Sequence, residues 1–226
     1  MTSDKPECAK CGIKDKICRS PKGQGPTFCP TLHRQQAVEK ANDEYGKPDI
    51  LKFAHEASVQ EAECYTNRGT KPYILHPIKP RVQEVCEFAQ KMAYTRLGIA
   101  FCSGLHGEAL SLNQILEAQG FEVVSVACKA GGTSKEHIGI SEEDKVRIGE
   151  FESMCSPIAQ AMILNQEETH FNILVGLCVG HDSLFLKYSK AYCTVLVAKD
   201  RILGHNPCAA LYTTGSYYAR MLRKGF

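Results

Sequence analysis

The chain has 226 residues, of which 43% are hydrophobic and 23% are charged, and its formal net charge at pH 7 is +2. These values are typical of a globular protein with a sizeable core, in one domain with an appendage or in two small domains. A charge so close to zero creates no general attraction for nucleic acid or for an anionic membrane, so neither is expected as a partner.

Residues 1–30 are rich in cysteine, lysine, proline and glycine and lack apolar periodicity, which predicts a loop module. Helical patterns follow at 31–42, 50–67 and 81–95. From residue 97 onward, short apolar runs alternate with helical patterns. Strands are predicted at 97–102, 121–128, 171–178 and 193–198, and helices at 108–119, 156–165, 181–189 and 206–222.

Strands that alternate with helices pair in parallel. The sequence therefore predicts an α/β fold with an open parallel sheet of about four strands flanked by helices. The expected domains are a cysteine-rich metal or cluster module at 1–30, a helical connector at 31–95 and the α/β domain at 96–226.

The expected location of the chain is the cytoplasm. No segment approaches the roughly 18 apolar residues that a membrane crossing needs, and residues 1–8 contain no apolar run typical of a secretory signal. Cytosolic thiols are kept reduced, so twelve cysteines indicate metal binding or catalysis rather than disulfides.

The first cysteine group has the spacing x2, x6 and x10 and consists of Cys8, Cys11, Cys18 and Cys29. Four thiolates can hold a zinc ion or a four-iron cluster. Structural zinc usually takes a second close pair, which is missing here, and Cys29 precedes Pro30, as the last cysteine of ferredoxin-type sites does. The pattern favours a [4Fe–4S] cluster over zinc.

The second cysteine group gathers at strand ends and helix starts. Cys102, Cys128 and Cys178 end predicted strands, while Cys155 and Cys208 lie at predicted helix starts. Both positions face the carboxyl edge of a parallel sheet, where ligands bind. A helix start also favours thiolate over thiol. We expect these five residues to hold a second cluster of unknown type.

Three histidines lie close in sequence to this second group: His106, His181 and His205. Each is a candidate ligand, proton donor or catalytic residue, although a structural role is more common for any single histidine. Cys64, Cys86 and Cys193 fall inside predicted helices or a strand and are interpreted as core thiols. The sequence has no glycine-rich nucleotide fingerprint.

The combination of motifs resembles an uncharacterised family of cysteine-rich, predicted metal-binding proteins of archaea and anaerobic bacteria, a domain-of-unknown-function family. The matching stretches cover nearly the whole chain and are the four-cysteine motif ending in Cys29-Pro30, residues 101–108, 177–182 and 205–208. The resemblance implies metal binding and an anaerobic host, with no settled reaction.

The leading hypothesis is an iron–sulfur protein with two centres. The N-terminal cluster would transfer electrons with a donor or acceptor protein, and the second centre would carry out redox or sulfur-related chemistry on an unknown small molecule. Such a protein is an iron–sulfur-dependent reductase or a sulfur-handling enzyme. The alternatives are a zinc-binding regulatory or metal-carrying module without turnover, and a thiol enzyme with Cys102 or Cys178 as nucleophile. A homodimer is left open.

Overall fold

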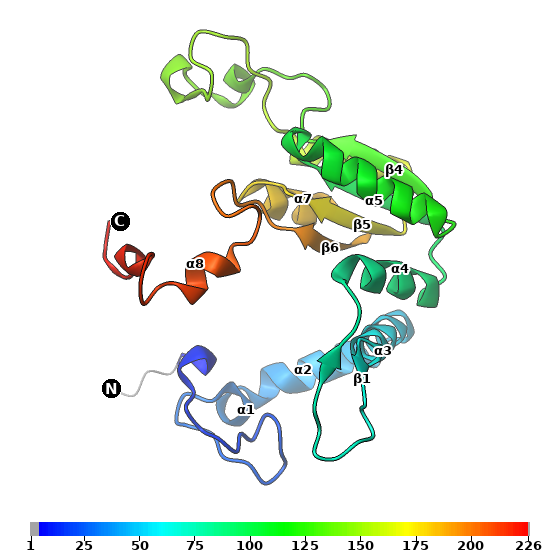
Figure 1. Ribbon diagram of the computed structural model, residues 1–226, viewed down its shortest axis with the longest axis vertical. Helices are drawn as coiled ribbons and strands as arrows, with labels where there is room; N and C mark the ends of the chain where they lie inside the picture. Colours follow the sequence, from blue (N-terminus) through cyan, green and yellow to red (C-terminus); the bar gives the residue numbers. More distant parts are fainter. Residues whose placement is uncertain (1–4, 226) are drawn as a thin grey trace. The chain divides into compact units, whose positions relative to one another are not determined.

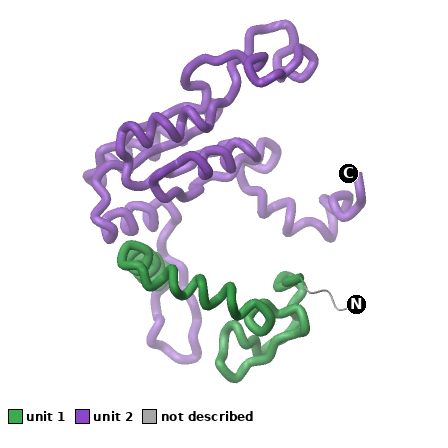
Figure 2. The backbone as a smooth tube through the Cα atoms, turned by 180° about the vertical axis from the view of Figure 1, so that it is seen from behind, with its two compact units in different colours: residues 1–62 green, residues 63–226 purple. Residues whose placement is uncertain are grey.

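The computed structural model describes residues 5–225. The chain divides into two compact units, residues 1–62 and residues 63–226 (Figure 2). The finer boundaries expected after residues 30 and 95 stay predictions. Each unit is described by itself.

Unit 1 consists of loops and helices. Two of its helices begin at prolines, Pro30 and Pro48, which fit the first turn because no backbone hydrogen bond is needed there. The helix predicted at 31–42 is two helices, because the backbone of Arg34 leaves the helical region at φ −134°. The elements are η1 (Cys8–Lys10), α1 (Pro30–His33), α2 (Gln35–Tyr45) and α3 (Pro48–Glu63), whose last residue already belongs to unit 2.

Unit 1 has almost no apolar core. Among its described residues, only Cys29 and Gln60 are buried. A module of this size without a core usually needs a disulfide or a metal to stay folded, and no disulfide occurs among the described residues.

Unit 2 is built on a parallel sheet whose strand order is β4-β3-β5-β6 (Figure 1). This confirms the predicted α/β fold. The strands are β3 (Arg96–Phe101), β4 (Glu122–Ala127), β5 (Phe171–Val175) and β6 (Tyr192–Val197).

The helices cover both faces of this sheet. The chain runs from β3 outward to β4 and then returns across β3 to β5 and β6. Right-handed crossovers place α5 on one face and α7 on the other (Figure 1), and α6 packs beside α7. The helices are α4 (Arg81–Lys91), α5 (His106–Ala118), α6 (Pro157–Gln166), α7 (His181–Tyr188) and α8 (Cys208–Tyr212).

The core lies between the sheet and these helices. Ile99 and Ile173 in the central strands and Phe185 in α7 are fully buried. Gln160 on α6 is a fully buried polar residue, and its amide donates hydrogen bonds to the carbonyls of Phe101, at 3.2 Å, and Val126, at 2.7 Å. Its Oε1 is buried without a partner among the described residues. Gln160 therefore ties together the carboxyl ends of β3 and β4.

A long excursion, residues 129–155, leaves the sheet between β4 and α6. Its two arms pair with each other, since Lys135 N donates to Glu152 O at 3.0 Å and Met154 N donates to Thr133 O at 2.7 Å. Its tip is held by the Lys145 ammonium, which bonds Glu136 at 2.5 Å and Glu142 at 2.7 Å. The excursion contains η3 (Lys135–Ile138) and η4 (Glu142–Asp144).

The prediction of a C-terminal helix at 206–222 is wrong in length, because the helix in the structure is much shorter. Helix α8 ends at Tyr212, and only the short η5 (Ala219–Leu222) follows. Two β-branched residues, Thr213 and Thr214, come next, and their hydroxyls bond back to carbonyls of the preceding turn. Gly215 follows them, and neither residue type favours a continued helix.

A small hairpin precedes the sheet. Strands β1 (Tyr65–Thr66) and β2 (His76–Pro77) pair antiparallel before α4 begins. In the described part of the chain, no helix has both the length and the apolar character that a bilayer crossing requires.

Candidate functional site

The strand ladder itself positions two cysteines of the second group. Cys102 directly follows β3 and its N–H donates to Val175 O of β5 at 3.0 Å. Cys128 directly follows β4 and its N–H donates to Phe101 O of β3 at 2.8 Å. Both thiols therefore emerge from neighbouring strands at the carboxyl edge of the sheet.

The pairing of the excursion arms returns a third cysteine to this edge. Ser156 N donates to Cys128 O at 2.7 Å, just before α6 begins. The Sγ atoms of Cys155 and Cys128 lie 3.7 Å apart. Two cysteines that are distant in sequence thus form a close sulfur pair.

The environment of Cys128 favours its thiolate. The Cys155 thiol donates a hydrogen bond to Cys128 Sγ, and Ser103 N donates a second one at 3.4 Å. The Ser103 hydroxyl lies 3.7 Å from Cys128 Sγ, and its contact and that of Cys102 also favour the thiolate. These contacts outweigh the burial and lower the pKa of Cys128 from 9.0 to about 5. The pKa of Cys155 is raised, first because its proton is held by Cys128 and second by burial.

A fourth cysteine, Cys178, reaches the same edge after β5. The turn that joins β5 to Cys178 contains Gly176, whose φ is +65°. A Cβ at this position would lie 2.5 Å from the Leu105 side chain, so the turn requires glycine. Cys178 adds a small electrostatic contribution to the raised pKa of Cys155, so the two side chains are close enough to interact. Arg201, beyond β6, donates to Cys178 Sγ at 3.1 Å.

Cys102 and Cys178 flank the point where the connections from β3 and β5 diverge to opposite sides of the sheet. This switch point is the usual ligand site of open α/β sheets. The structure therefore brings Cys102, Cys128, Cys155 and Cys178 to one edge, and at that edge it leaves one thiolate ready to act as a donor.

The remaining predicted residues have other surroundings. Cys208 is exposed at the start of α8, and His106 is exposed with its ring edge towards Phe101. His181 begins α7, and His205 accepts a hydrogen bond from Asp200 N at 3.1 Å. No contact of these four residues with the sulfur pair occurs among the described interactions.

The N-terminal cysteines lie in unit 1. Cys8 and Cys11 are joined by a turn in which Cys11 N donates to Cys8 O at 3.1 Å. Cys18 is exposed, whereas Cys29 is buried and caps α1. A Cβ at Gly25 would lie 3.0 Å from Cys29 Sγ, so glycine is needed beside this thiol.

No three His, Cys, Asp or Glu side chains of residues 5–225 are grouped closely enough to hold a metal ion as they stand. The close pair is Cys128 and Cys155. Ligation by either cysteine group would therefore require side-chain rotation of its other members.

The three cysteines interpreted as core thiols lie away from this edge or within the packed sheet. Cys64 and Cys86 are buried, and burial raises the pKa values of Cys86 and Cys193. Cys193 donates to the Ala191 carbonyl at 3.2 Å.

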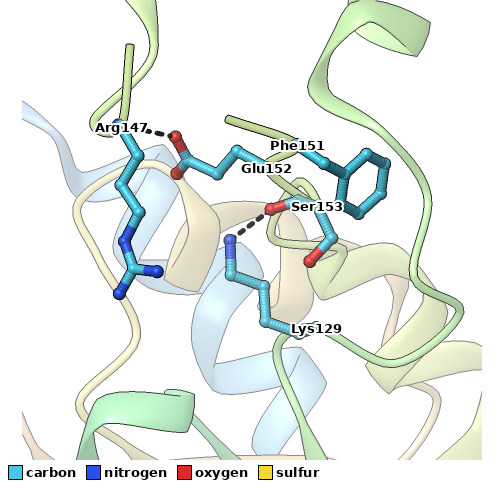
Figure 3. A pocket seen from close by; sticks show the side chains of 5 residues that line it. All are labelled: Lys129, Arg147, Phe151, Glu152 and Ser153. Atoms are coloured by element: carbon cyan, nitrogen blue, oxygen red, sulfur yellow. Dashed lines mark hydrogen bonds between the residues drawn. The ribbon is translucent and has the colours of Figure 1, made fainter. Parts of the chain in front are cut away.

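A hollow of about 360 Å³ opens within the base of the excursion. It is lined by Lys129, Arg147, Phe151, Glu152 and Ser153 (Figure 3). Lys129 directly follows Cys128 in the sequence, and Ser153 precedes Cys155 by two residues. The Lys129 ammonium donates to the Ser153 carbonyl, which connects the two arms of the excursion beside the sulfur pair.

Comparison with known proteins places residues 29–196 in a protein family described as of unknown function, DUF1847. The chain belongs to this family. It is also 43% identical to an uncharacterised protein of the archaeon Methanocaldococcus jannaschii over 192 residues, which is 85% of this chain and 91% of the relative. No solved structure matches the chain.

The part of the chain that matches DUF1847 contains all four cysteines at the carboxyl edge of the sheet, Cys102, Cys128, Cys155 and Cys178, which we call the sulfur edge. Cys8, Cys11, Cys18 and Cys208 lie outside the matched range. The family match thus includes Cys29 alone of the N-terminal motif.

Sequence reasoning missed three residues of this edge: Ser103, Lys129 and Arg201. Ser103 and Lys129 each follow a strand-end cysteine, so their positions gave a usable signal. Arg201 gave none, because its contact with Cys178 depends on the path of the loop after β6.

Proposed function

We propose that this protein is an iron–sulfur protein with two metal centres. Cys102, Cys128, Cys155 and Cys178 hold one centre at the sheet edge. The N-terminal group, Cys8, Cys11, Cys18 and Cys29, holds a [4Fe–4S] cluster for electron transfer. The observation that carries the proposal is the 3.7 Å separation between the Sγ atoms of Cys128 and Cys155.

This separation matches two thiolates on one metal ion. A tetrahedral ion with metal–sulfur bonds of about 2.3 Å has sulfur–sulfur edges of about 3.8 Å. A disulfide would instead require about 2.05 Å. A cluster of four irons and four cysteines takes one thiolate per iron, so the pair suits a single iron or a [2Fe–2S] cluster better.

The donors at the sheet edge have the chemistry that such a centre requires. Metal ligation needs thiolate, and the lowered pKa of Cys128 supplies it at neutral pH. The N–H groups of Ser103 and Arg201 point at sulfur, and hydrogen bonds of this kind stabilise ligand thiolates. When bound, the centre supplies redox or Lewis-acid chemistry for a small molecule.

The N-terminal centre is supported by the lack of a core in unit 1. Four thiols lie in a segment whose described residues bury one cysteine and no larger apolar side chain. A cluster there would stabilise the module by cross-linking its loops. Its electrons would come from, or go to, a partner protein.

A zinc-binding regulatory or metal-carrying module is the second candidate. The 3.7 Å sulfur separation accommodates zinc as well as iron, because both take thiolates at similar distances. The Cys29-Pro30 ending of the N-terminal motif favours iron.

Metal analysis of the protein purified without oxygen tests the proposal. We expect iron and acid-labile sulfide, a brown colour, and two overlapping electron paramagnetic resonance signals after reduction. Cys128→Ser with Cys155→Ser should remove one signal, and Cys8→Ser with Cys11→Ser the other. Cys193→Ser is the matched control, since a serine keeps the hydrogen bond to Ala191 O.

A colourless protein that carries one or two zinc ions would contradict the iron–sulfur proposal and support the zinc module. Loss of both signals from either double variant would contradict the assignment of two separate centres.

A further inference from the structure

The hollow in the base of the excursion combines two cations with an aromatic ring. In the view of Figure 3, the Lys129 ammonium lies between the Arg147 guanidinium and the Phe151 ring. A volume of about 360 Å³ is within the range of sites for small organic molecules.

The charges of the hollow favour an anion. Lys129 donates to a neutral carbonyl, and no carboxylate among residues 5–225 lies within ion-pair distance of it. Arg147 is 74% exposed and lies 3.6 Å from Glu150, which is a weak surface pair. Both cations therefore remain able to bind a ligand.

The one carboxylate that lines the hollow is already neutralised. Glu152 bonds the Lys135 ammonium at 2.8 Å and accepts hydrogen bonds from Val146 N at 2.9 Å and Arg147 N at 3.2 Å. These contacts lower its pKa to about 2, so it stays ionised and paired. It offers little attraction for a cationic ligand.

Phe151 supplies an apolar wall. It is 72% exposed, and it lines the hollow together with the two cationic side chains (Figure 3). An aromatic face left open in this way can stack against a planar ligand, and stacking of this type is favourable in partly dry sites.

We propose that this hollow binds a small organic anion, a carboxylate with a planar apolar body. Its acid group lies against Lys129 and Arg147, and its body lies against Phe151. That such a ligand is the substrate of the adjacent sulfur centre rests on the proposed function, because Lys129 and Ser153 lead directly to Cys128 and Cys155. The binding itself does not depend on metal.

Fluorine NMR titration of the full chain with 4-fluorobenzoate tests the proposal, with 4-fluorobenzylamine as a cation of the same shape. We expect 4-fluorobenzoate to bind with a dissociation constant of about 1 mM or tighter. Arg147→Gln and Lys129→Met should each weaken binding by about tenfold, as the loss of a charged hydrogen bond does.

Matched controls are Arg19→Gln and Lys187→Met, which remove exposed cations elsewhere. Lys129→Met also removes the bond to Ser153 and could loosen the excursion, so Arg147→Gln is the decisive variant. Equal binding of 4-fluorobenzylamine, unchanged binding in Arg147→Gln, or no binding of 4-fluorobenzoate at about 10 mM would overturn the proposal.

Metal content measured on the same samples separates this proposal from the proposed function. Anion binding without any bound metal would support the hollow and contradict the metal centre. Bound metal without anion binding would support the metal centre and contradict the proposed anion site.

Discussion

At the scale of single residues, Cys128 stands out because its surroundings favour the thiolate. The metal-free protein should contain the Cys128 thiolate even at mildly acidic pH, because the pKa of this thiol is lowered to about 5. The ultraviolet absorbance of the thiolate should rise with pH through that value and level off above it. The absorbance difference between the parent chain and Cys128→Ser across the pH range measures this, and it needs no reagent to reach the buried sulfur.

Cys155→Ala removes the largest cause of the lowered pKa. The pH midpoint of the Cys128 thiolate absorbance should therefore move upward in this variant, while Cys208→Ser should leave it unchanged. A midpoint that stays near 5 in Cys155→Ala would contradict the sulfur–sulfur hydrogen bond as its cause.

The sequence predicted that cysteines would lie at the carboxyl edge of the sheet, but it did not predict which of them would be in contact. Cys102 and Cys128 could be placed because a residue that follows a parallel strand must lie at its carboxyl edge. That Cys155 and not Cys208 forms the close pair depends on the pairing of the excursion arms. Side-chain contacts between distant loops leave no periodic pattern in a sequence.

At the scale of elements, Gly176 fixes the turn that carries Cys178 to the edge. Gly176→Ala should lower the free energy of unfolding by about 1–3 kcal/mol, because alanine is strained at φ +65° and its Cβ would press on Leu105. Urea unfolding followed by circular dichroism measures the change.

Gly107→Ala is the matched control. It lies in α5 with open space around a Cβ, so alanine there should be neutral or stabilise the helix by up to about 1 kcal/mol. Equal effects of the two substitutions would show that the turn does not need glycine.

The Lys145 side chain, which is 4% exposed, holds the tip of the excursion. Lys145→Met should open it, since Glu136 and Glu142 lose their common partner. Chymotrypsin should then cleave faster after Phe151 at neutral pH. Lys187→Met is the control and should be cleaved at the wild-type rate. Cleavage of Lys145→Met at the wild-type rate would contradict the role of the ion pairs in holding the tip.

The same ion pairs make the excursion sensitive to acid. The pKa values of Glu136 and Glu142 are lowered, chiefly by their hydrogen bonds to Lys145. Stability from a lowered carboxyl pKa is complete above the unfolded value of about 4.3 and is lost as the pH falls through the folded one. Hydrogen exchange of residues 134–152, corrected for intrinsic rates, should therefore accelerate below about pH 4.

Elements were predictable where one pattern dominated. The four strands and α4 to α7 follow from apolar runs, start signals and helix-ending glycines. The end of α8 was missed because threonines that bond to their own backbone are not visible in apolar periodicity.

At the scale of the whole molecule, the two units differ in what keeps them folded. Unit 2 has an extended apolar core, whereas the described part of unit 1 buries only Cys29 and Gln60. We expect Cys8→Ser with Cys11→Ser, or removal of metal by a chelator, to unfold residues 5–62 and leave the sheet intact.

Hydrogen exchange resolved by peptide measures this difference between the units. Exchange in α2 should become fast in the double variant, while exchange in β3 and β5 should stay slow. Protection of unit 1 that survives metal removal would show that its helices need no cross-link.

Gln160 carries a cost that its own hydrogen bonds offset. Its buried Oε1 has no partner among the described residues, and an unsatisfied buried oxygen costs roughly 1–3 kcal/mol. A methionine would fit the same space without that cost, but it would also lose the hydrogen bonds to Phe101 O and Val126 O. The two effects are of similar size, so Gln160→Met is expected to melt within a few degrees of the parent chain. The amide therefore adds direction to the carboxyl edge of the sheet without adding heat tolerance.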